Sequence, residues 1–272
     1  MKKTIVITGA SRGIGKAIAI ELAGKDTNIV INCVNNVDKL NEVKSIIEKK
    51  GSVCETFIGD MGNYSDVQKM FDMCLQRFGQ VDVLINNAGI SVVGLFQDMG
   101  ENEWHRICNT NIDSVFNCCH FAVKDMMKRH CGKIINISSV WGLYGASCEV
   151  AYSATKGAVN SFTKALAKEL APSGIQVNAV ACGAIDTEMN GHLSDDDKAS
   201  LAEEIPAGRF GSPQEVAKLV KSLSGMNSYL TGQIITLDGG SACITFINLN
   251  HGAAFPLLLR DFFLNLFLYL II

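Results

Sequence analysis

The sequence predicts an α/β protein built on a doubly wound parallel sheet with helices on both faces. Hydrophobic residues make up 48% of the 272 positions and charged residues 19%, which suits a sheet that is buried on both sides. Continuous apolar runs alternate along the chain with segments of helical spacing. A glycine-rich turn joins the first apolar run to the first helical segment, and right-handed crossovers then give the doubly wound arrangement.

Each predicted strand is a short apolar run rich in β-branched residues, which pack well on a pleated surface. The strands are 4–8, 28–33, 54–58, 81–85, 133–137, 175–180 and 233–237. The predicted helices are 16–23, 37–50, 64–78, 101–109, 113–129 and 152–170. Pro172 lies just beyond the last of these helices, as expected for a helix stop. Because no repeat or linker interrupts the pattern, residues 1–241 are predicted to form one domain.

The bulk composition argues against several classes of protein. A net charge of −3 provides no basic field that would attract nucleic acid. The ten cysteines form no CxxC pair and no zinc-finger spacing with histidine, so we expect no metal site and reduced thiols. Met1, Lys2 and Lys3 run directly into a strand pattern without the apolar core of a signal peptide, and we expect a cytoplasmic protein.

The C-terminal residues 242–272 form an unusual apolar tail. Residues 255–272 would span about 27 Å as a helix, but Arg260, Asp261 and Asn265 interrupt them, so they do not predict a membrane span. We expect the tail to pack at a subunit interface or to be disordered. The alternatives are a shifted reading frame and, after that, membrane contact.

The glycine-rich turn is a candidate site for a phosphate group. Its residues are Thr8, Gly9, Ala10, Ser11, Arg12, Gly13, Ile14 and Gly15. Glycines let the backbone turn tightly and approach a pyrophosphate, and the helix that follows offers free N–H groups. The alternative is an ordinary tight turn between a strand and a helix.

A tyrosine and a lysine form the candidate catalytic centre. Tyr152 and Lys156 lie four positions apart, which places them on one face of a helix. We expect the ammonium to lower the pKa of the phenol from about 10, which would make Tyr152 a workable acid or base near neutral pH. Upstream, Ser138 and Ser139 end a predicted strand and could donate a hydrogen bond to a substrate carbonyl. The alternative is an amphipathic helix with a surface lysine.

Over residues 2–241 the chain resembles the short-chain dehydrogenase/reductase family. The turn pattern TGxxxGxG, the sequence from Asn86 to Gly89 and the spacing of Tyr152 and Lys156 carry this resemblance. It implies a Rossmann-type fold and hydride transfer to or from a nicotinamide cofactor. It assigns catalysis to Asn111, which would hold a water for a proton relay, Ser139, Tyr152 and Lys156, with Ser138 as the structural alternative to Ser139. The alternative for Asn111 is an amide that caps or kinks a helix, and this role can coexist with the relay.

The resemblance also assigns the cofactor contacts. They are Gly9, Ser11, Arg12, Gly13, Ile14 and Gly15 in the turn, Asp60 at the adenine, Asn87, Ala88 and Gly89 at the adenine ribose, Tyr152 and Lys156, and Ile185 and Thr187 at the nicotinamide amide. Residues 31–36 contain no acid that would repel a 2′-phosphate, and Arg12 can pair with one. We therefore expect NADP(H) rather than NAD(H).

The substrate is predicted from a closer resemblance to bacterial 3-oxoacyl-[acyl-carrier-protein] reductases, carried by residues 207–217, 229–233 and 238–240. This implies a 3-oxoacyl thioester on a carrier protein and a homotetramer. Lys128 and Arg129 are candidate contacts for the carrier protein, or else a solvated helix end. The alternatives are another carbonyl, such as 5-aminopentanone-modified elongation factor P or a steroid or sugar ketone, and a non-catalytic NADP(H)-sensing protein.

Two further features remain open in the sequence. Cys182 stands where the family usually has proline, either as a small packed residue or as a reactive thiol near the cofactor. Residues 190–212, where the family covers its substrate, include His192, Glu203 and Glu204, which we expect on a solvated helix without a chemical role.

Overall fold

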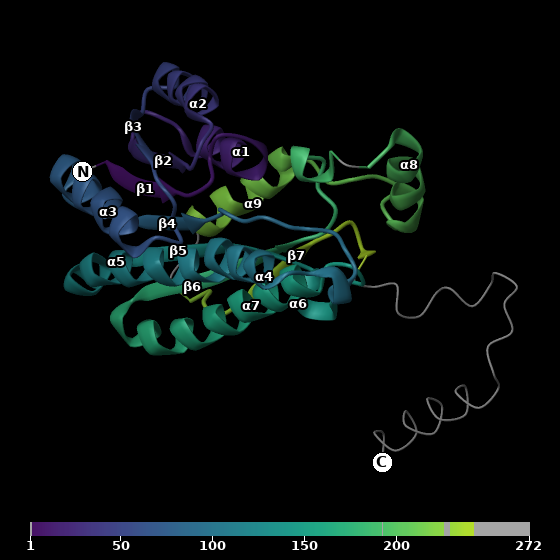
Figure 1. Cartoon of the computed structure of the whole chain (residues 1–272). Coiled ribbons are helices and arrows are strands. Elements are labelled where there is room, and N and C mark those ends of the chain that lie inside the picture. Colours follow the sequence, from purple (N-terminus) through teal and green to yellow (C-terminus); the bar gives the residue numbers. More distant parts are fainter. Residues whose placement is uncertain (1, 192, 226–228, 242–272) are drawn as a thin grey trace, which may run out of the picture. The chain divides into compact units, whose positions relative to one another are not determined.

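The computed structural model describes residues 2–191, 193–225 and 229–241 (Figure 1). Within them lies a fully parallel sheet with the strand order β3-β2-β1-β4-β5-β6-β7. Its strands are β1 Lys3–Ile7, β2 Thr27–Cys33, β3 Val53–Ile58, β4 Val83–Asn86, β5 Gly132–Ser139, β6 Ile175–Cys182 and β7 Ile234–Leu237. The order reverses between β1 and β4, which confirms the doubly wound fold predicted from the sequence.

Helices cover both faces of the sheet. They are α1 Gly13–Leu22, α2 Val37–Lys49, α3 Tyr64–Phe78, α4 Glu101–Cys108, α5 Ser114–Arg129, α6 Trp141–Tyr144, α7 Val150–Leu170, α8 Asp195–Glu204 and α9 Pro213–Gly225. Most agree closely with the predicted ranges. The helix α3 matches its prediction at both ends, because Asn63 caps its first turn and Gly79 ends it in the left-handed conformation.

The core forms two layers, and the alternation of side chains along β1 shows how. Ile5 and Ile7 pack with α1, α2 and α9, whereas Val6 points to the other face with α3, α5 and α7. These strand residues are almost completely buried. Since both faces are covered, the strands are apolar at nearly every position, which is the pattern the sequence shows.

The helix α9 was not predicted, although its start carries a recognisable signal. Ser212 and Glu215 form a reciprocal cap, in which the Ser212 N–H donates to Glu215 Oε2 at 2.8 Å and the Glu215 N–H donates to Ser212 Oγ at 3.3 Å. The helix buries Val216 and Val220 against α1 and the sheet. It thereby supports the helix that follows the glycine turn.

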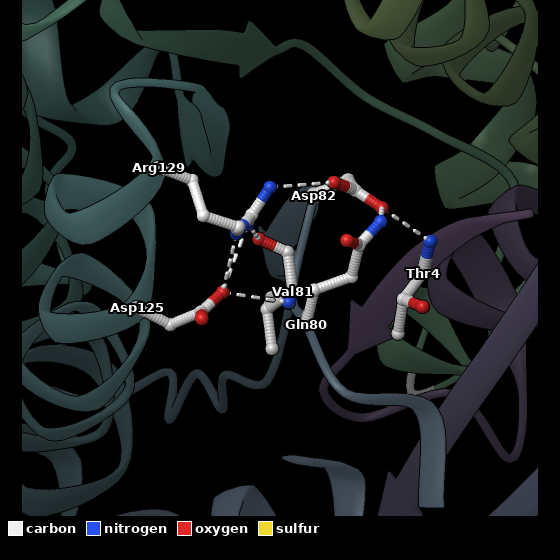
Figure 2. Close-up of polar contacts among 6 residues, drawn as sticks. All are labelled: Thr4, Gln80, Val81, Asp82, Asp125 and Arg129. Carbon is white, nitrogen blue, oxygen red and sulfur yellow. Dashed lines mark hydrogen bonds and ion pairs between the residues drawn. The ribbon is translucent and has the colours of Figure 1, made fainter. Parts of the chain in front are cut away.

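An ion-pair network joins residues at the amino-terminal ends of the strands (Figure 2). The site residues lie at the opposite, carboxyl ends of the strands. Arg129, the last residue of α5, donates to Asp82 Oδ1 at 2.9 Å, to Asp125 Oδ2 at 2.8 Å and to the Val81 carbonyl oxygen. Asp82 also accepts from the Thr4 N–H at 2.7 Å. The network therefore joins the end of α5 to the entrances of both β4 and β1.

The predicted tail, residues 242–272, lies outside the described residues. Among the described residues, no helix combines the length and the apolar composition that crossing a membrane requires.

Candidate active site

The predicted site residues meet at the carboxyl edge of the sheet, although they are spread over most of the chain. The glycine turn follows β1, Asp60 follows β3, Asn87 to Gly89 follow β4, Ser139 ends β5, and Ile185 and Thr187 follow β6. Asn111 precedes α5, while Tyr152 and Lys156 lie in the first turns of α7. Open parallel sheets bind ligands at this edge, near the point where the strand order reverses.

The glycine turn is held in place by the segment after β4. Thr8 Oγ1 accepts from the N–H groups of Asn87 and Ala88, both at 3.0 Å. The Asn87 side chain donates back to the carbonyl oxygens of Thr8 at 3.0 Å and Gly9 at 2.9 Å. Gly9 has a φ of +64°, and a Cβ there would lie 2.9 Å from Ala88 Cα, so this close approach requires glycine.

The start of α1 fits the pyrophosphate of a dinucleotide. The helix has no side-chain cap and no acidic residue in its first turn, so its N–H groups and positive dipole end face the turn. A Cβ on Gly13 would lie 3.5 Å from Thr187 Cγ2, so Thr187 stands directly across from the turn. Gly13 and Thr187 also border the same groove of about 550 Å³. The groove is lined by Lys16 and Lys198 but also by Asp186 and Glu188, so the free N–H groups at the start of α1 are the feature that suits an anion.

Asn32 is a supporting residue that the sequence reading did not single out. It is buried near the end of β2, where its Oδ1 accepts from the Gly9 N–H at 3.4 Å and its Nδ2 donates to the Gly59 carbonyl oxygen at 3.0 Å. It thus joins the glycine turn to the loop after β3. Asp60, the predicted adenine contact, lies in that loop and accepts from the Gly62 N–H at 2.9 Å.

Ser139, Tyr152 and Lys156 come together near Gly89 of the loop after β4. A hydrogen bond links Tyr152 to Ser139, and the Lys156 ammonium lies 5.6 Å from the centre of the Tyr152 ring. The neighbouring Ser138 points to the opposite side of the strand and donates to the Lys156 carbonyl oxygen at 3.3 Å. Of the two serines, Ser139 is therefore the one whose hydroxyl faces the tyrosine.

The electrostatic state of this centre differs from the expectation. Burial raises the pKa of Tyr152, with opposition from its hydrogen bond to Ser139, so the expected net lowering of this pKa is wrong, because burial outweighs the groups that favour the phenolate. Burial also lowers the pKa of Lys156 to about 8. Its ammonium donates to the Ile137 carbonyl oxygen at 2.9 Å, and this contact was not visible in the spacing of the two residues.

Asn111 lies in a π-helical turn, Asn109–Asp113, between α4 and α5. It is fully buried, and its side chain accepts from the Ile90 N–H at 2.8 Å and donates to the Ile90 carbonyl oxygen at 2.9 Å. It also donates to Thr155 Oγ1, next to Lys156, at 3.0 Å. Its amide thus holds the loop after β4 against α7, which is the helix-bending role that we placed beside the relay role.

Gly89 lies between the two halves of the site. A Cβ on Gly89 would lie 3.3 Å from Asn111 Oδ1 and 3.4 Å from Lys156 Nζ. Any side chain here would occupy the space in front of the lysine. The absence of one leaves that space to a ligand, which agrees with the predicted cofactor contact at this position.

Cys182 is a packed residue next to Ser139 in the sheet. It pairs with Ser139 in the β5–β6 register and is 5% exposed. Burial raises the pKa of its thiol to about 12, although Lys156 opposes the rise. A neutral, enclosed thiol is a poor nucleophile, so the packed alternative fits the structure. The cysteines of the described ranges are all free, and those ranges contain no metal-binding group of three or more His, Cys, Asp or Glu residues.

The expected carrier-protein contact at Arg129 needs correction, and part of the expected substrate-covering segment lies outside the described residues. Arg129 belongs to the ion-pair network at the amino edge, far from the catalytic edge, so it is not a carrier-protein contact beside the site. Lys128 lies in the same last turn of α5. Glu203 and Glu204 are exposed on α8, while His192 lies outside the described residues.

Comparisons with known proteins show which family the chain resembles. The family model described as short chain dehydrogenase matches residues 3–198. The chain is 40% identical over 241 residues to the 3-oxoacyl-[acyl-carrier-protein] reductase FabG of Staphylococcus epidermidis, covering 88% of this chain and 99% of that one.

Two solved structures share the fold. A short-chain type dehydrogenase/reductase from Mycobacterium marinum has a TM-score of 0.84 and 35% identity, covering 89% of this chain and 96% of that one. The structure described as ElxO with NADP bound has a TM-score of 0.82 and 33% identity, covering 89% of this chain and 100% of that one. The chain therefore belongs to the short-chain dehydrogenase family, and it is an oxidoreductase that uses a nicotinamide cofactor.

Proposed function

We propose that the protein reduces 3-oxoacyl thioesters on acyl carrier protein to 3-hydroxyacyl thioesters, with NADPH as the electron donor. The convergence of Ser139, Tyr152 and Lys156 beside the glycine turn carries the chemistry of this proposal. The 40% identity to a 3-oxoacyl-[acyl-carrier-protein] reductase supports the substrate.

The three side chains have complementary tasks. The Ser139 hydroxyl donates a hydrogen bond to the carbonyl oxygen, where negative charge develops. Tyr152 gives its proton to that oxygen, and a raised pKa keeps the phenol protonated for this step. The Lys156 ammonium stabilises the phenolate and passes on a replacement proton. Bound NADPH would supply the hydride that adds to the carbonyl carbon.

The preference for NADPH rests on charge. The end of β2 and the residues after it, Asn32 to Asn36, contain no carboxylate, whereas the exposed Arg12 lies at the start of α1. An arginine can pair with a 2′-phosphate, and a carboxylate at the end of β2 would repel it. One relative in the same family, ElxO, was solved with NADP bound.

We further propose the homotetramer that the family resemblance implies. The side chains of Trp104 on α4 and of Phe116 and Met127 on α5 are exposed apolar groups that an interface would cover. Sedimentation of the purified chain at micromolar concentration gives a tetramer if this is right and a monomer if it is wrong.

Turnover by Tyr152→Phe tests the catalytic assignment. We expect kcat for reduction of an acetoacetyl thioester by NADPH to fall about 10²–10⁴-fold, because the substitution removes the proton donor. NADPH binding and the melting temperature should stay near those of the wild type. Undiminished activity would overturn the assignment and favour a protein that only senses NADP(H).

A substrate panel tests the choice of carbonyl. Loss of NADPH absorbance is followed with acetoacetyl-[acyl-carrier-protein], a steroid ketone, a sugar ketone and aminopentanone-modified elongation factor P. The carrier-bound thioester should have the highest kcat/KM. A higher value for any of the others replaces the proposed substrate and leaves the chemistry in place.

A further inference from the structure

A carboxylate stands beside the catalytic tyrosine, and the mechanism above does not use it. Glu149 occupies the N-cap position of α7, three residues before Tyr152, yet its side chain makes no capping hydrogen bond. Tyr152 lies in the first turn of the helix that begins directly after Glu149, so the two residues are close along the chain. The Glu149 charge acts on the Tyr152 hydroxyl.

The Glu149 carboxylate is held by the loop after β4. Ser91 Oγ donates to Glu149 Oε1 at 2.5 Å, and the Gly94 N–H donates to the Cys148 carbonyl oxygen at 2.8 Å. Ile90, the residue before Ser91, is fixed by two hydrogen bonds with the Asn111 side chain: the Ile90 N–H donates to Oδ1, and Nδ2 donates to the Ile90 carbonyl oxygen. The carboxylate is therefore positioned by the same loop that forms one wall of the site.

The charge of Glu149 is not neutralised by the protein. Throughout the described ranges no lysine, arginine or histidine forms an ion pair with it, and Ser91 supplies only a neutral donor. Within the described ranges, the Ser91 hydroxyl is the hydrogen-bond donor found for Glu149 Oε1. A carboxylate can accept further hydrogen bonds. Negative charge near the reacting carbonyl oxygen also opposes reduction unless a donor offsets it.

Several apolar side chains are exposed in the segments next to this carboxylate. Val93 and Leu95 follow Ser91, Leu143 and Tyr144 lie on α6, and Val150 follows Glu149, all with exposed side chains. Exposed apolar side chains near one fixed carboxylate suit a substrate that is mostly hydrocarbon and carries one N–H group.

We propose that Glu149, positioned by Ser91, is a specificity-determining residue that accepts a hydrogen bond from an N–H group on the substrate chain near the reacting carbonyl. The inference rests on the proposed carbonyl reduction and narrows its substrate. The N–H group has two sources: the amide of a pantetheine thioester, or the ammonium of an amine-bearing ketone.

Two matched pairs of substrates test the proposal in the full-length chain with NADPH. The first pair is the acetoacetyl thioester of N-acetylcysteamine, which has an amide N–H, and the S-pentyl acetoacetyl thioester, which has none. The second pair is 7-amino-2-heptanone and 2-octanone. We expect the wild type to prefer the N–H member of at least one pair by about tenfold in kcat/KM, the value of one hydrogen bond to a charged group.

Substitutions at Glu149 then separate the two sources. Glu149→Leu should abolish the preference, because it removes the acceptor. Glu149→Gln should keep a preference for the amide, since its carbonyl oxygen still accepts, and lose a preference for the ammonium. Ser91→Ala leaves the carboxylate present but less fixed and should reduce the preference about twofold.

The matched control is Glu169→Gln, which makes the same charge change in the last turn of the same helix, about 30 Å from Glu149. It should keep the wild-type ratios. Equal ratios in the wild type and in Glu149→Leu overturn the role of Glu149, even when all substrates are reduced. Reduction of none of the four substrates instead refutes the proposed function, and the inference falls with it.

Discussion

Lys156 on α7 donates a hydrogen bond from Nζ to the Ile137 carbonyl oxygen on β5, at a distance of 2.9 Å. Ile137 lies two residues before Ser139 on β5, so the bond holds the ammonium next to the catalytic end of this strand. A Cβ on Gly89 would lie 3.4 Å from Lys156 Nζ, so the glycine leaves space beside the ammonium. Lys156 is only 5% exposed, and burial is the reason that its pKa falls to about 8.

The lowered pKa of Lys156 predicts how activity depends on pH. Below pH 8 the lysine is charged and can pass a proton to Tyr152, and above pH 8 it becomes neutral. Because the pKa of Tyr152 is raised, the phenol keeps its proton over the same range. We expect kcat/KM for carbonyl reduction to fall above about pH 8, as measured by steady-state kinetics from pH 6 to 10.

Lys156→Arg is the control for this pH profile. A guanidinium stays charged throughout the range, so the variant should be slower but should lack the decrease above pH 8. A decrease at the same pH in Lys156→Arg would show that another group controls it.

Arg12→Met should weaken the preference for NADPH over NADH. The substitution removes the cation of the glycine turn while keeping an unbranched side chain, so the 2′-phosphate loses a partner. We expect the ratio of kcat/KM values for the two cofactors to fall about tenfold, mainly through NADPH. Arg77→Met, at the far end of α3, should leave the ratio unchanged. An unchanged ratio in Arg12→Met would assign the 2′-phosphate to other residues.

The thiol of Cys182 should resist alkylation in the folded protein. Its pKa of about 12 leaves almost no thiolate at pH 7.5, and its side chain is enclosed. Mass spectrometry after brief iodoacetamide treatment should find modification at the exposed Cys131 and none at Cys182. Unfolding in guanidinium should make both reactive. Modification of native Cys182 that NADPH prevents would revive the reactive-thiol alternative.

Arg129→Met should destabilise the fold without changing the chemistry. It leaves Asp82 and Asp125, whose side chains are only 15% and 14% exposed, without their shared cation. We expect urea unfolding to show a loss of about 2–4 kcal/mol, with kcat close to that of the wild type, since the network lies at the opposite edge of the sheet.

Arg77→Met is also the control for this loss of stability. Its pair with Glu55 is more exposed, at 58% and 30%, so its removal should cost less than about 1 kcal/mol. Equal losses in the two variants would mean that burial does not govern the contribution of Arg129.

Local sequence signals predicted most of the strands and helices. The elements that were missed are those whose local signals were overlooked or are weak. The strand and helix ranges followed from apolar periodicity, and α3 was placed correctly at both ends because Asn63 and Gly79 define them. The helix α9 was missed although Ser212 and Glu215 form its cap. The π-helical turn at Asn109–Asp113 was read only as a gap between two helices, because nothing in the periodicity marks one extra residue in a turn.

The sequence by itself determined the family, the alternation of strands and helices, and which residues are candidates for hydride transfer. These depend on motifs with fixed spacing, such as Tyr152 and Lys156 on one helix face. Only the tertiary structure decided the direction of the pKa shift at Tyr152, the structural task of Arg129 and the meeting of Ser91 with Glu149. The reason is physical, because burial and contacts between distant segments exist only once the chain has folded around its sheet.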